Sequence, residues 1–169
     1  MPYSIHFLGA VIDSHSETYD PKTNILYFSG IPIVYLPPNE PDLLLQRPIG
    51  NLTINDCWLM KGSEGYVEIK LHQAVKVHHL DYHHFNQTEL YDSMPKIIIV
   101  EGITSNTTVL LGKFEDFGNV TQRIVHSNHT VVSHVRLRIL ENYGNPIYTS
   151  LCRFQLFGEE EVSQEKKSA

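Results

Sequence analysis

The chain has 169 residues, of which 41% are hydrophobic and 19% are charged, and its net charge is −6 at pH 7. This length fits one domain with a sizeable core, and this composition excludes an intrinsically disordered chain. The acidic balance argues against nucleic acid as the main partner, and two cysteines are too few for a disulfide scaffold, although one bridge is possible.

The start of the chain has no feature typical of a membrane anchor. Residues 1–8 are too short and lack the basic start of a signal peptide, and no apolar run approaches the roughly 20 residues that span a bilayer. We therefore expect a soluble domain, which could be the lumenal or extracellular piece of a larger protein. Asn-x-Ser/Thr triplets mildly favour the secretory pathway, where they accept glycans on surface loops. They begin at Asn51, Asn86, Asn106, Asn119 and Asn128.

Short β-rich runs separated by turn residues follow one another along the chain, and no stretch of useful length has a helical period. This pattern is typical of an all-β sandwich or barrel. The predicted strands, in chain order, are Ile25–Phe28, Ile31–Leu36, Tyr66–Leu71, Val77–Phe85, Lys96–Gly102, Val109–Phe114, Gln122–Val125, His134–Leu140 and Ser150–Phe157.

The first two predicted strands form a hairpin. Ser29-Gly30 supplies a tight turn between two apolar runs, and Pro32 lacks a backbone donor, which places its strand at an edge. Composition favours a hairpin packed on its own domain. The alternative is an exposed edge that receives a strand from a partner.

Histidines gather around the predicted strand Val77–Phe85, and alternation sorts them into two faces. One face carries His79, Asp81 and His83, which could bind a zinc ion, but a solvated polar face is the favoured interpretation. His84 lies on the other face with Leu80 and Tyr82. We therefore expect it to be buried and to need a hydrogen-bonding partner.

Two further segments contain conspicuous aromatic residues. The lone Trp58, before the glycine-bracketed turn into Tyr66–Leu71, is predicted to anchor the core. Near the C-terminus, two alternating strands flank the turn 142–149, which carries Tyr143 and Tyr148. No nucleophile elbow, phosphate-binding loop, dinucleotide fingerprint or zinc-protease motif is present, so we expect no enzyme activity.

An ordered set of short motifs resembles a SUN domain from about residue 9 to residue 159. The resemblance implies a lead-in at 1–8, a hairpin lid at 18–39 and a charged tail at 160–169. The motifs are Ser16-Glu17-Thr18-Tyr19, Gly30-Ile31-Pro32, Asp56-Cys57-Trp58, Lys61-Gly62, Gly65-Tyr66, Leu110-Leu111-Gly112-Lys113-Phe114, Leu137-Arg138-Ile139-Leu140, Asn142-Tyr143-Gly144, Pro146, Tyr148-Thr149 and Arg153-Phe154.

The family resemblance implies a fold, a place and a partner. SUN domains are discoidin-like β-sandwiches of inner nuclear membrane proteins and lie in the perinuclear space. They form homotrimers below a coiled coil, which this chain lacks. They bind the C-terminal tails of KASH proteins of the outer nuclear membrane, in the LINC complex that couples nucleus to cytoskeleton. The membrane would be reached only through segments absent from this chain.

The resemblance also implies a peptide site. The tail would lie along the lid, whose predicted contact residues are Tyr19, Ile25, Tyr27, Ile31, Ile33 and Tyr35. Its terminal carboxylate would enter a pocket whose donors fall on His84, Ser93 and Tyr148. Cys152 stands where the family usually has a second tyrosine.

Several positions depart from the family pattern. The family pairs the cysteine before the tryptophan with one at the position of Ser150. A Cys57–Cys152 bridge is therefore possible only if the local backbone adjusts, and the unbridged alternative is favoured. His15 replaces the cysteine that can bond covalently to a KASH tail, which excludes that link. The loop that binds a potassium or sodium ion in the family is about three residues longer here, so a cation cannot be assumed. Its candidate residues are Gln46, Asn51, Asn55 and Asp56.

A rival function follows from the same architecture. Discoidin-like sandwiches include carbohydrate-binding modules, which would use aromatic residues at loop tips. The position of Trp58 in a core segment counts against this alternative.

Overall fold

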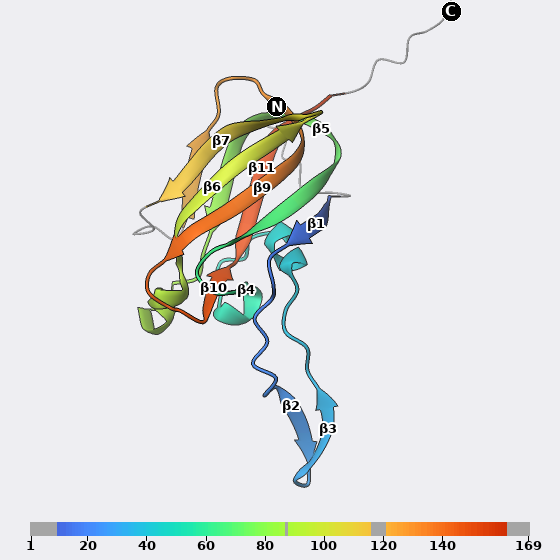
Figure 1. Cartoon of the computed structure of the whole chain (residues 1–169), viewed down its shortest axis with the longest axis vertical. Helices are drawn as coiled ribbons and strands as arrows, with labels where there is room; N and C mark the ends of the chain where they lie inside the picture. The colour runs from blue at the N-terminus through green and yellow to red at the C-terminus, as the bar shows by residue number, and fades with distance from the viewer. Residues whose placement is uncertain (1–9, 87, 116–120, 162–169) are drawn as a thin grey trace, which may run out of the picture.

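A computed structural model describes residues 10–86, 88–115 and 121–161, and within these ranges the chain is built almost wholly from strands (Figure 1). Its helical segments there are short 3-10 turns, and none is long and apolar enough to cross a membrane. In chain order the elements are β1 Val11–His15, β2 Ile25–Phe28, β3 Ile31–Tyr35, η1 Pro41–Leu45, η2 Ile54–Asp56, β4 Trp58–Lys61, β5 Gly65–His83, η3 Thr88–Ser93, β6 Pro95–Thr104, β7 Thr107–Glu115, β8 Thr121–Val125, β9 Val131–Asn142, β10 Tyr148–Leu151 and β11 Arg153–Glu160.

The long strand β5 belongs to both layers of the sandwich. Its first half pairs with β1 and β9, and the sheet continues from β9 through β6 to β7. Its second half pairs with β11 and β8. Figure 1 shows the two layers facing each other along the upper part of the molecule. The predicted all-β sandwich is confirmed.

Alternation explains how β5 faces one core along its whole length. Val67 and Ile69 are buried in the first half, and Leu80 and Tyr82 are buried in the second. The two sets differ in parity, because the pairing with β11 shifts between Val77 and His79 and leaves one extra residue there. Such a bulge re-aims the side chains that follow it.

The predicted strands are found, with changes at their boundaries. The two segments predicted at 66–71 and 77–85 are a single strand, and the last predicted strand is interrupted at Cys152. Strands β1 and β4 were not predicted. The sequence of β1, Val-Ile-Asp-Ser-His, is largely polar, and β4 is only four residues long.

The core lies between the layers and is closed at the lower end by Trp58, which is fully buried as predicted. Its indole nitrogen donates to Thr18 Oγ1 at 2.9 Å, so its polar atom is also satisfied. Burying a large apolar side chain contributes about 1.5–3 kcal/mol. The largest fully buried side chains are Trp58, Tyr82, Phe85, Phe114 and Phe154.

The hairpin of β2 and β3 extends away from the sandwich (Figure 1). Both residues of its turn have positive φ, 49° at Ser29 and 78° at Gly30, which is the geometry that twists with the flanking strands. Its apolar side chains are exposed, and Phe28 reaches 70%. The hairpin lid implied by the family resemblance is therefore found as a projecting hairpin (Figure 1), and the interpretation from composition, that it packs on its own domain, is wrong.

Candidate functional site

The lower end of the sandwich joins the hairpin through β4. Residues 17–19 run alongside this strand: the Lys61 amide donates to the Glu17 carbonyl at 2.9 Å, and the Tyr19 amide donates to the Leu59 carbonyl at 2.8 Å. Strand β4 pairs on its other side with β10, where Tyr148 lies opposite Lys61. The root of the hairpin is thus hydrogen-bonded to the small sheet of β4 and β10, which Figure 1 shows at the end of the sandwich nearest the hairpin.

Buried polar side chains form a continuous chain beside this small sheet. His84, directly after β5, is 4% exposed, and Ser93 and Ser150 are fully buried. Ser93 Oγ lies 2.9 Å from Ser150 Oγ, which in turn lies 3.4 Å from His84 Nε2. Ser93 and Ser150 are further tied by the Ser150 hydroxyl, which donates to the Ser93 carbonyl at 3.2 Å. The structure therefore brings together His84 and Ser93, two of the residues predicted for the carboxylate pocket, through Ser150.

The protonation of His84 follows from its surroundings. Burial lowers the pKa of this imidazole to about 3, so it is neutral at physiological pH. The Tyr82 oxygen accepts from the Cys152 amide at 3.3 Å and lies 2.8 Å from His84 Nδ1. The Ser150 hydroxyl gives its one proton to the Ser93 carbonyl, so its oxygen accepts from His84 Nε2. The proton of the imidazole is therefore on Nε2, and Nδ1 accepts from the Tyr82 phenol. His84 Nε2 is then a neutral donor directed at the serines.

Tyr148 contacts the root of the hairpin and lies on the strand that carries Ser150. It precedes Ser150 by two residues on β10, so both side chains lie on one face of the strand. Its half-buried ring stacks on Tyr19, with centroids 5.1 Å apart and planes 21° apart. Partial burial, followed by the nearby Asp92 carboxylate, raises the pKa of the Tyr148 phenol. The phenol therefore stays protonated and able to donate at neutral pH.

The turn before β10 fixes where Tyr148 lies. The buried Asn142 amide donates to the carbonyls of Asn145 and Tyr148 at 2.7 and 3.2 Å, and its side-chain oxygen accepts from the Gly144 amide at 3.0 Å. The Asn145 side-chain oxygen accepts from the Tyr148 amide at 3.1 Å. Gly144 has a φ of 117°, which an L side chain rarely adopts. These bonds give a structural reason for the Asn-Tyr-Gly-Asn-Pro sequence of the turn.

Cys57 and Cys152 form a disulfide, so the expectation that they stay unbridged is wrong. The reason lies in strand register. In the pairing of β10 with β4, Ser150 lies opposite Leu59 and Leu151 opposite Trp58, so the next pair is Cys152 and Cys57. Their Cα atoms are 4.1 Å apart. Direct opposition across an antiparallel pair brings the two sulfurs within bonding distance, at the residue where the strand is interrupted.

The disulfide forms part of the wall of the polar site. Cys152 Sγ lies 3.4 Å from His84 Nδ1, but as half of a disulfide it brings no hydroxyl. Tyr82 and Ser150 supply hydroxyls there, and neither was among the predicted site residues. Alternation on β5 pointed to the burial of Tyr82, and the position of Ser150 two residues after Tyr148 was a usable signal for the other.

The candidate cation loop is held by protein groups. The Asp56 carboxylate accepts from the Thr53 amide at 2.8 Å and from the Thr53 hydroxyl at 3.2 Å, which caps η2. The buried Arg153 guanidinium donates to the carbonyls of Asp56 and Cys152, and to that of Arg47 at 3.3 Å.

Carbonyls that converge in this way would suit a cation, and here they receive the fixed positive charge of Arg153. The other loop residues have separate positions: Gln46 follows η1, Asn51 is exposed in a turn, and the Asn55 carbonyl accepts from the Asn39 side chain at 2.8 Å.

The predicted lid residues differ in their surroundings. Tyr27, Ile31 and Ile33 are between 57% and 65% exposed, on a hairpin that has both edges unpaired within the described residues. The Tyr35 hydroxyl donates to Asp20, which lowers the pKa of the Asp20 carboxyl and ties β3 to the root of the hairpin. Ile25, opposite Tyr35, and Tyr19 lie nearer the body.

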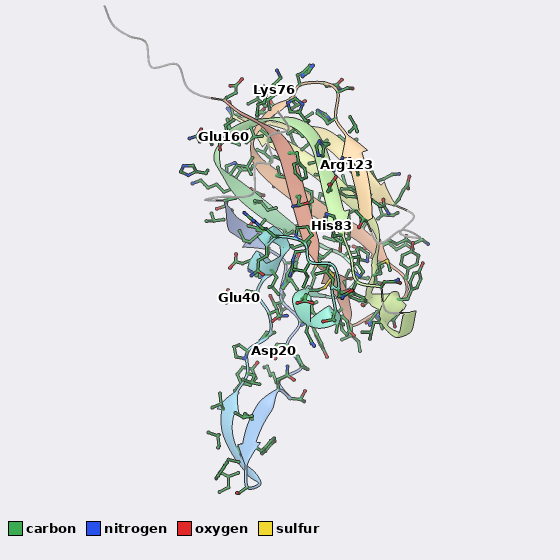
Figure 2. The ribbon with its side chains drawn as sticks, turned by 180° about the vertical axis from the view of Figure 1, so that it is seen from behind. Asp20, Glu40, Lys76, His83, Arg123 and Glu160 are labelled. Atoms are coloured by element: carbon green, nitrogen blue, oxygen red, sulfur yellow. A yellow bond between two sulfur atoms is a disulfide. The ribbon has the colours of Figure 1, made fainter. Side chains whose placement is uncertain are left out.

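The histidines of the proposed zinc alternative do not converge on one point. Asp81 is buried and accepts two hydrogen bonds from Arg123 at 2.8 and 2.9 Å. His83 contacts Thr121 and Gln155, and His79 stacks on Phe157. Figure 2 shows His83 and Arg123 on the body of the sandwich, away from Asp20 at the root of the hairpin. The side chains of this face contact residues on the neighbouring strands β8 and β11. The face is therefore less solvated than the predicted polar face.

Solved structures with the same fold define the class. The family 32 carbohydrate-binding module of C. perfringens NanJ, solved in complex with galactose, has a TM-score of 0.66 and 10% identity, covering 93% of this chain and 99% of that one. A putative chitobiase fragment from Bacteroides thetaiotaomicron has a TM-score of 0.68 and 13% identity, covering 97% of both chains. The protein is thus a discoidin-like β-sandwich, here with a projecting hairpin.

Sequence comparison then identifies the family. The family described as Sad1 / UNC-like C-terminal matches residues 36–160. SUN domain-containing protein 1 of Homo sapiens is 31% identical over 89% of this chain and 20% of its own length. Nuclear migration and anchoring protein unc-84 of Caenorhabditis elegans is 29% identical over 89% of this chain and 15% of its own. The chain belongs to the SUN-domain family, and it spans a fifth or less of these two relatives.

Proposed function

We propose that this SUN domain binds the C-terminal peptide of a KASH protein in the perinuclear space. The peptide adds a strand to the exposed hairpin of β2 and β3, and its terminal carboxylate enters the site of His84, Ser93 and Tyr148. As part of a homotrimeric inner nuclear membrane protein, the domain would link nucleus to cytoskeleton. Its role would be that of a structural linker rather than an enzyme.

The observation that carries this proposal is the junction between an apolar hairpin and a buried set of neutral donors. The Tyr19–Tyr148 stack joins the two, so a peptide lying on the hairpin would end beside the polar chain. Hairpin and peptide would supply main-chain hydrogen bonds and apolar contact to each other. The donors would select an end that carries negative charge.

The chemistry of the polar chain suits a carboxylate. Three donors are available at neutral pH: the imidazole N–H of His84, the hydroxyl of Ser93 and the phenol of Tyr148. In the structure the Ser93 hydroxyl donates to the Leu90 carbonyl at 3.0 Å and lies 2.9 Å from Ser150 Oγ, so a carboxylate oxygen would have to take its proton from these partners. No formal positive charge among these donors offsets the carboxylate. Selectivity would therefore rest on hydrogen bonding in a site from which water is excluded.

Peptide titration tests the carboxylate site. We expect a KASH tail peptide with a free C-terminus to bind, and the same peptide with an amidated C-terminus to bind about 10–100-fold more weakly, because hydrogen bonds to a charged group contribute about 1.5–3 kcal/mol. The double variant Tyr148→Phe/His84→Ala should abolish binding of the free-acid peptide. Isothermal titration calorimetry measures both.

A matched control changes the same residue types outside the site. Tyr66 is exposed on β5 and His78 is partly exposed at the bulge, so Tyr66→Phe/His78→Ala should keep full affinity. Equal affinity for the acid and the amide, or unchanged affinity in the Tyr148→Phe/His84→Ala variant, would show that the carboxylate does not enter this site. The amide comparison uses the unaltered protein and is independent of any folding defect.

A further inference from the structure

The four asparagines of Asn-x-Ser/Thr triplets that the structure describes lie at two opposite ends of the molecule (Figure 1). Asn51 and Asn86 lie near η2 and η3, at the end that carries the hairpin. Asn106 lies in the turn between β6 and β7, and Asn128 lies in the loop between β8 and β9. All four side chains are exposed and outside strands, and Asn119 lies outside the described residues.

Backbone contacts place the turn of Asn106 and the loop of Asn128 at the same end. Ile103 near the end of β6 pairs with His134 near the start of β9, and the Ser133 hydroxyl donates to the Ile103 carbonyl at 3.1 Å. The loop before β9 bonds to the middle of β5, where the Val77 amide donates to the Thr130 carbonyl at 2.9 Å. Lys76 marks this end in Figure 2, far from Asp20 at the root of the hairpin.

Asn106 lies at the tip of a tight turn. Thr104 pairs with Thr107, so only Ser105 and Asn106 bridge the two strands. Asn106, Thr107 and Thr108 are all exposed, so the complete triplet is open to solvent. A large hydrophilic group at this tip would extend into water and displace no packed side chain.

The loop of Asn128 is held from beneath. His126 is buried, with its Nδ1 3.2 Å from the Leu111 carbonyl and its Nε2 2.8 Å from Thr130 Oγ1, and its amide donates to the His78 carbonyl at 2.8 Å. His129 has a positive φ of 52°, which turns the chain tightly between these anchors. Asn128 is therefore directed outward from a fixed base.

We propose that Asn106 and Asn128 carry N-linked glycans, which cover the end of the domain opposite the hairpin. In this transfer the side-chain amide nitrogen bonds to the anomeric carbon of a lipid-diphosphate-linked oligosaccharide. The carbon–oxygen bond to the diphosphate breaks, the amide loses a proton, and the lipid diphosphate leaves. Attached glycans are bulky and solubilising, so they bar this end from protein contacts and leave the hairpin and the polar site free.

The glycan proposal rests on the proposed perinuclear location, because the chain must enter the lumen of the secretory pathway to meet the lipid-linked oligosaccharide. Glycan attachment and peptide binding use opposite ends, so each can fail alone. A domain that is glycosylated but binds no tail would contradict the proposed function only. A domain that binds tails but stays unmodified in the lumen would contradict the glycan sites only.

The test directs the chain, with an added signal sequence, into the secretory pathway of animal cells. Peptide-N-glycosidase digestion in heavy-oxygen water then converts each occupied asparagine to a labelled aspartate, which mass spectrometry locates. We expect labels at 106 and 128. Loss of one glycan should increase the electrophoretic mobility of the protein by one step, and we expect this for Asn106→Gln and for Asn128→Gln. The controls Ser105→Ala and Thr130→Ser keep both triplets and should leave the mobility unchanged.

Peptide titration completes the test. The glycosylated and the enzymatically deglycosylated domain should bind a free-acid KASH tail peptide with the same affinity, because the glycans lie away from the hairpin. Absence of label at both asparagines in the secreted protein would overturn the proposal. The variant Asn51→Gln/Asn86→Gln keeps the two sites at the far end. If its affinity for the peptide rose on deglycosylation, the glycans at that end would interfere with binding, and the proposal that they leave the hairpin free would be wrong.

Discussion

His84 has a neutral, buried imidazole whose contacts leave Nε2 as a donor. The groups in contact with it are Tyr82 from β5, Ser150 from β10, Cys152 and the neighbouring Phe85. Tyr82 is the one titratable group among them, and burial raises the pKa of its phenol, so it stays neutral as well. The site therefore keeps its proton arrangement across the physiological pH range.

The lowered pKa of His84 makes the domain sensitive to acid. Its pKa is 6.5 in the unfolded chain and about 3 in the folded one, so between these values the unfolded chain binds more protons. Stability is fully present above pH 6.5 and falls as the pH drops toward 3. We expect this residue alone to remove about 2 kcal/mol of unfolding free energy between neutral pH and about pH 5.

Urea denaturation at several pH values measures this loss. His84→Gln, which keeps a polar amide and does not titrate, should be less stable at neutral pH but should show a flatter decline on acidification. His78→Ala serves as the control and should keep the wild-type decline. An equal pH dependence in His84→Gln and wild type would mean that His84 is not the group responsible.

At the scale of elements, the hairpin of β2 and β3 depends on its own turn and strand pairing. It buries no core residue, and β3 receives one further support where Tyr35 bonds Asp20. An exposed two-stranded hairpin is marginally stable in water. A substitution in the turn should therefore change how well the hairpin is ordered, and it should leave the stability of the sandwich unchanged.

Gly30→Val tests this separation. A β-branched residue at φ of 78° costs about 1–2 kcal/mol, so we expect the variant to loosen the hairpin and weaken tail binding while the unfolding midpoint of the sandwich stays unchanged. Hydrogen exchange of the amides of 25–35 reports the hairpin directly.

Gly50→Val offers a matched comparison. Gly50 also has open space around its Cα, but no positive φ, and should keep both hairpin protection and affinity. A drop in the melting temperature of Gly30→Val would indicate that the hairpin supports the core after all.

Sequence patterns predicted the strands that alternate strongly and the side chains that alternation places. They gave the burial of His84 correctly, because Leu80, Tyr82 and His84 follow the bulge without interruption. They could not give the bulge itself, nor the partners of each strand. The disulfide is the clearest case: aligning Ser150 with the family cysteine obscured the pairing, which only the register of β4 and β10 reveals.

The candidate site shows the same limit. His84, Ser93 and Tyr148 could be assigned from the family resemblance, and the structure brings the first two into one hydrogen-bonded chain through Ser150. The partnership of Arg153 with the carbonyls of Arg47 and Asp56 joins residues about a hundred positions apart. Contacts of that kind depend on how the ends of the chain fold back, which local pattern does not encode.

At the scale of the molecule, one covalent bond closes the lower end of the sandwich. Cys57 and Cys152 are separated by 95 positions, so their bridge restricts most of the unfolded chain. We expect Cys57→Ser/Cys152→Ser to lower the unfolding free energy by about 2–5 kcal/mol.

Denaturation with and without a reducing agent distinguishes this contribution. Reductant should destabilise the wild type to about the level of the double variant and should leave the double variant unchanged. Alkylation of two free thiols in unreduced wild-type protein would contradict the bridge.

The pairing of residues 17–19 with β4 also determines how the molecule bears load. A pull on the hairpin enters the body along Glu17–Tyr19 and passes through the hydrogen bonds to Leu59 and Lys61 into β4. From there it reaches β10 through backbone pairing, and at the end of that pairing it meets the sulfur–sulfur bond. Even if traction broke the hydrogen bonds between β4 and β10, the covalent link would hold Cys152 beside Cys57, next to His84.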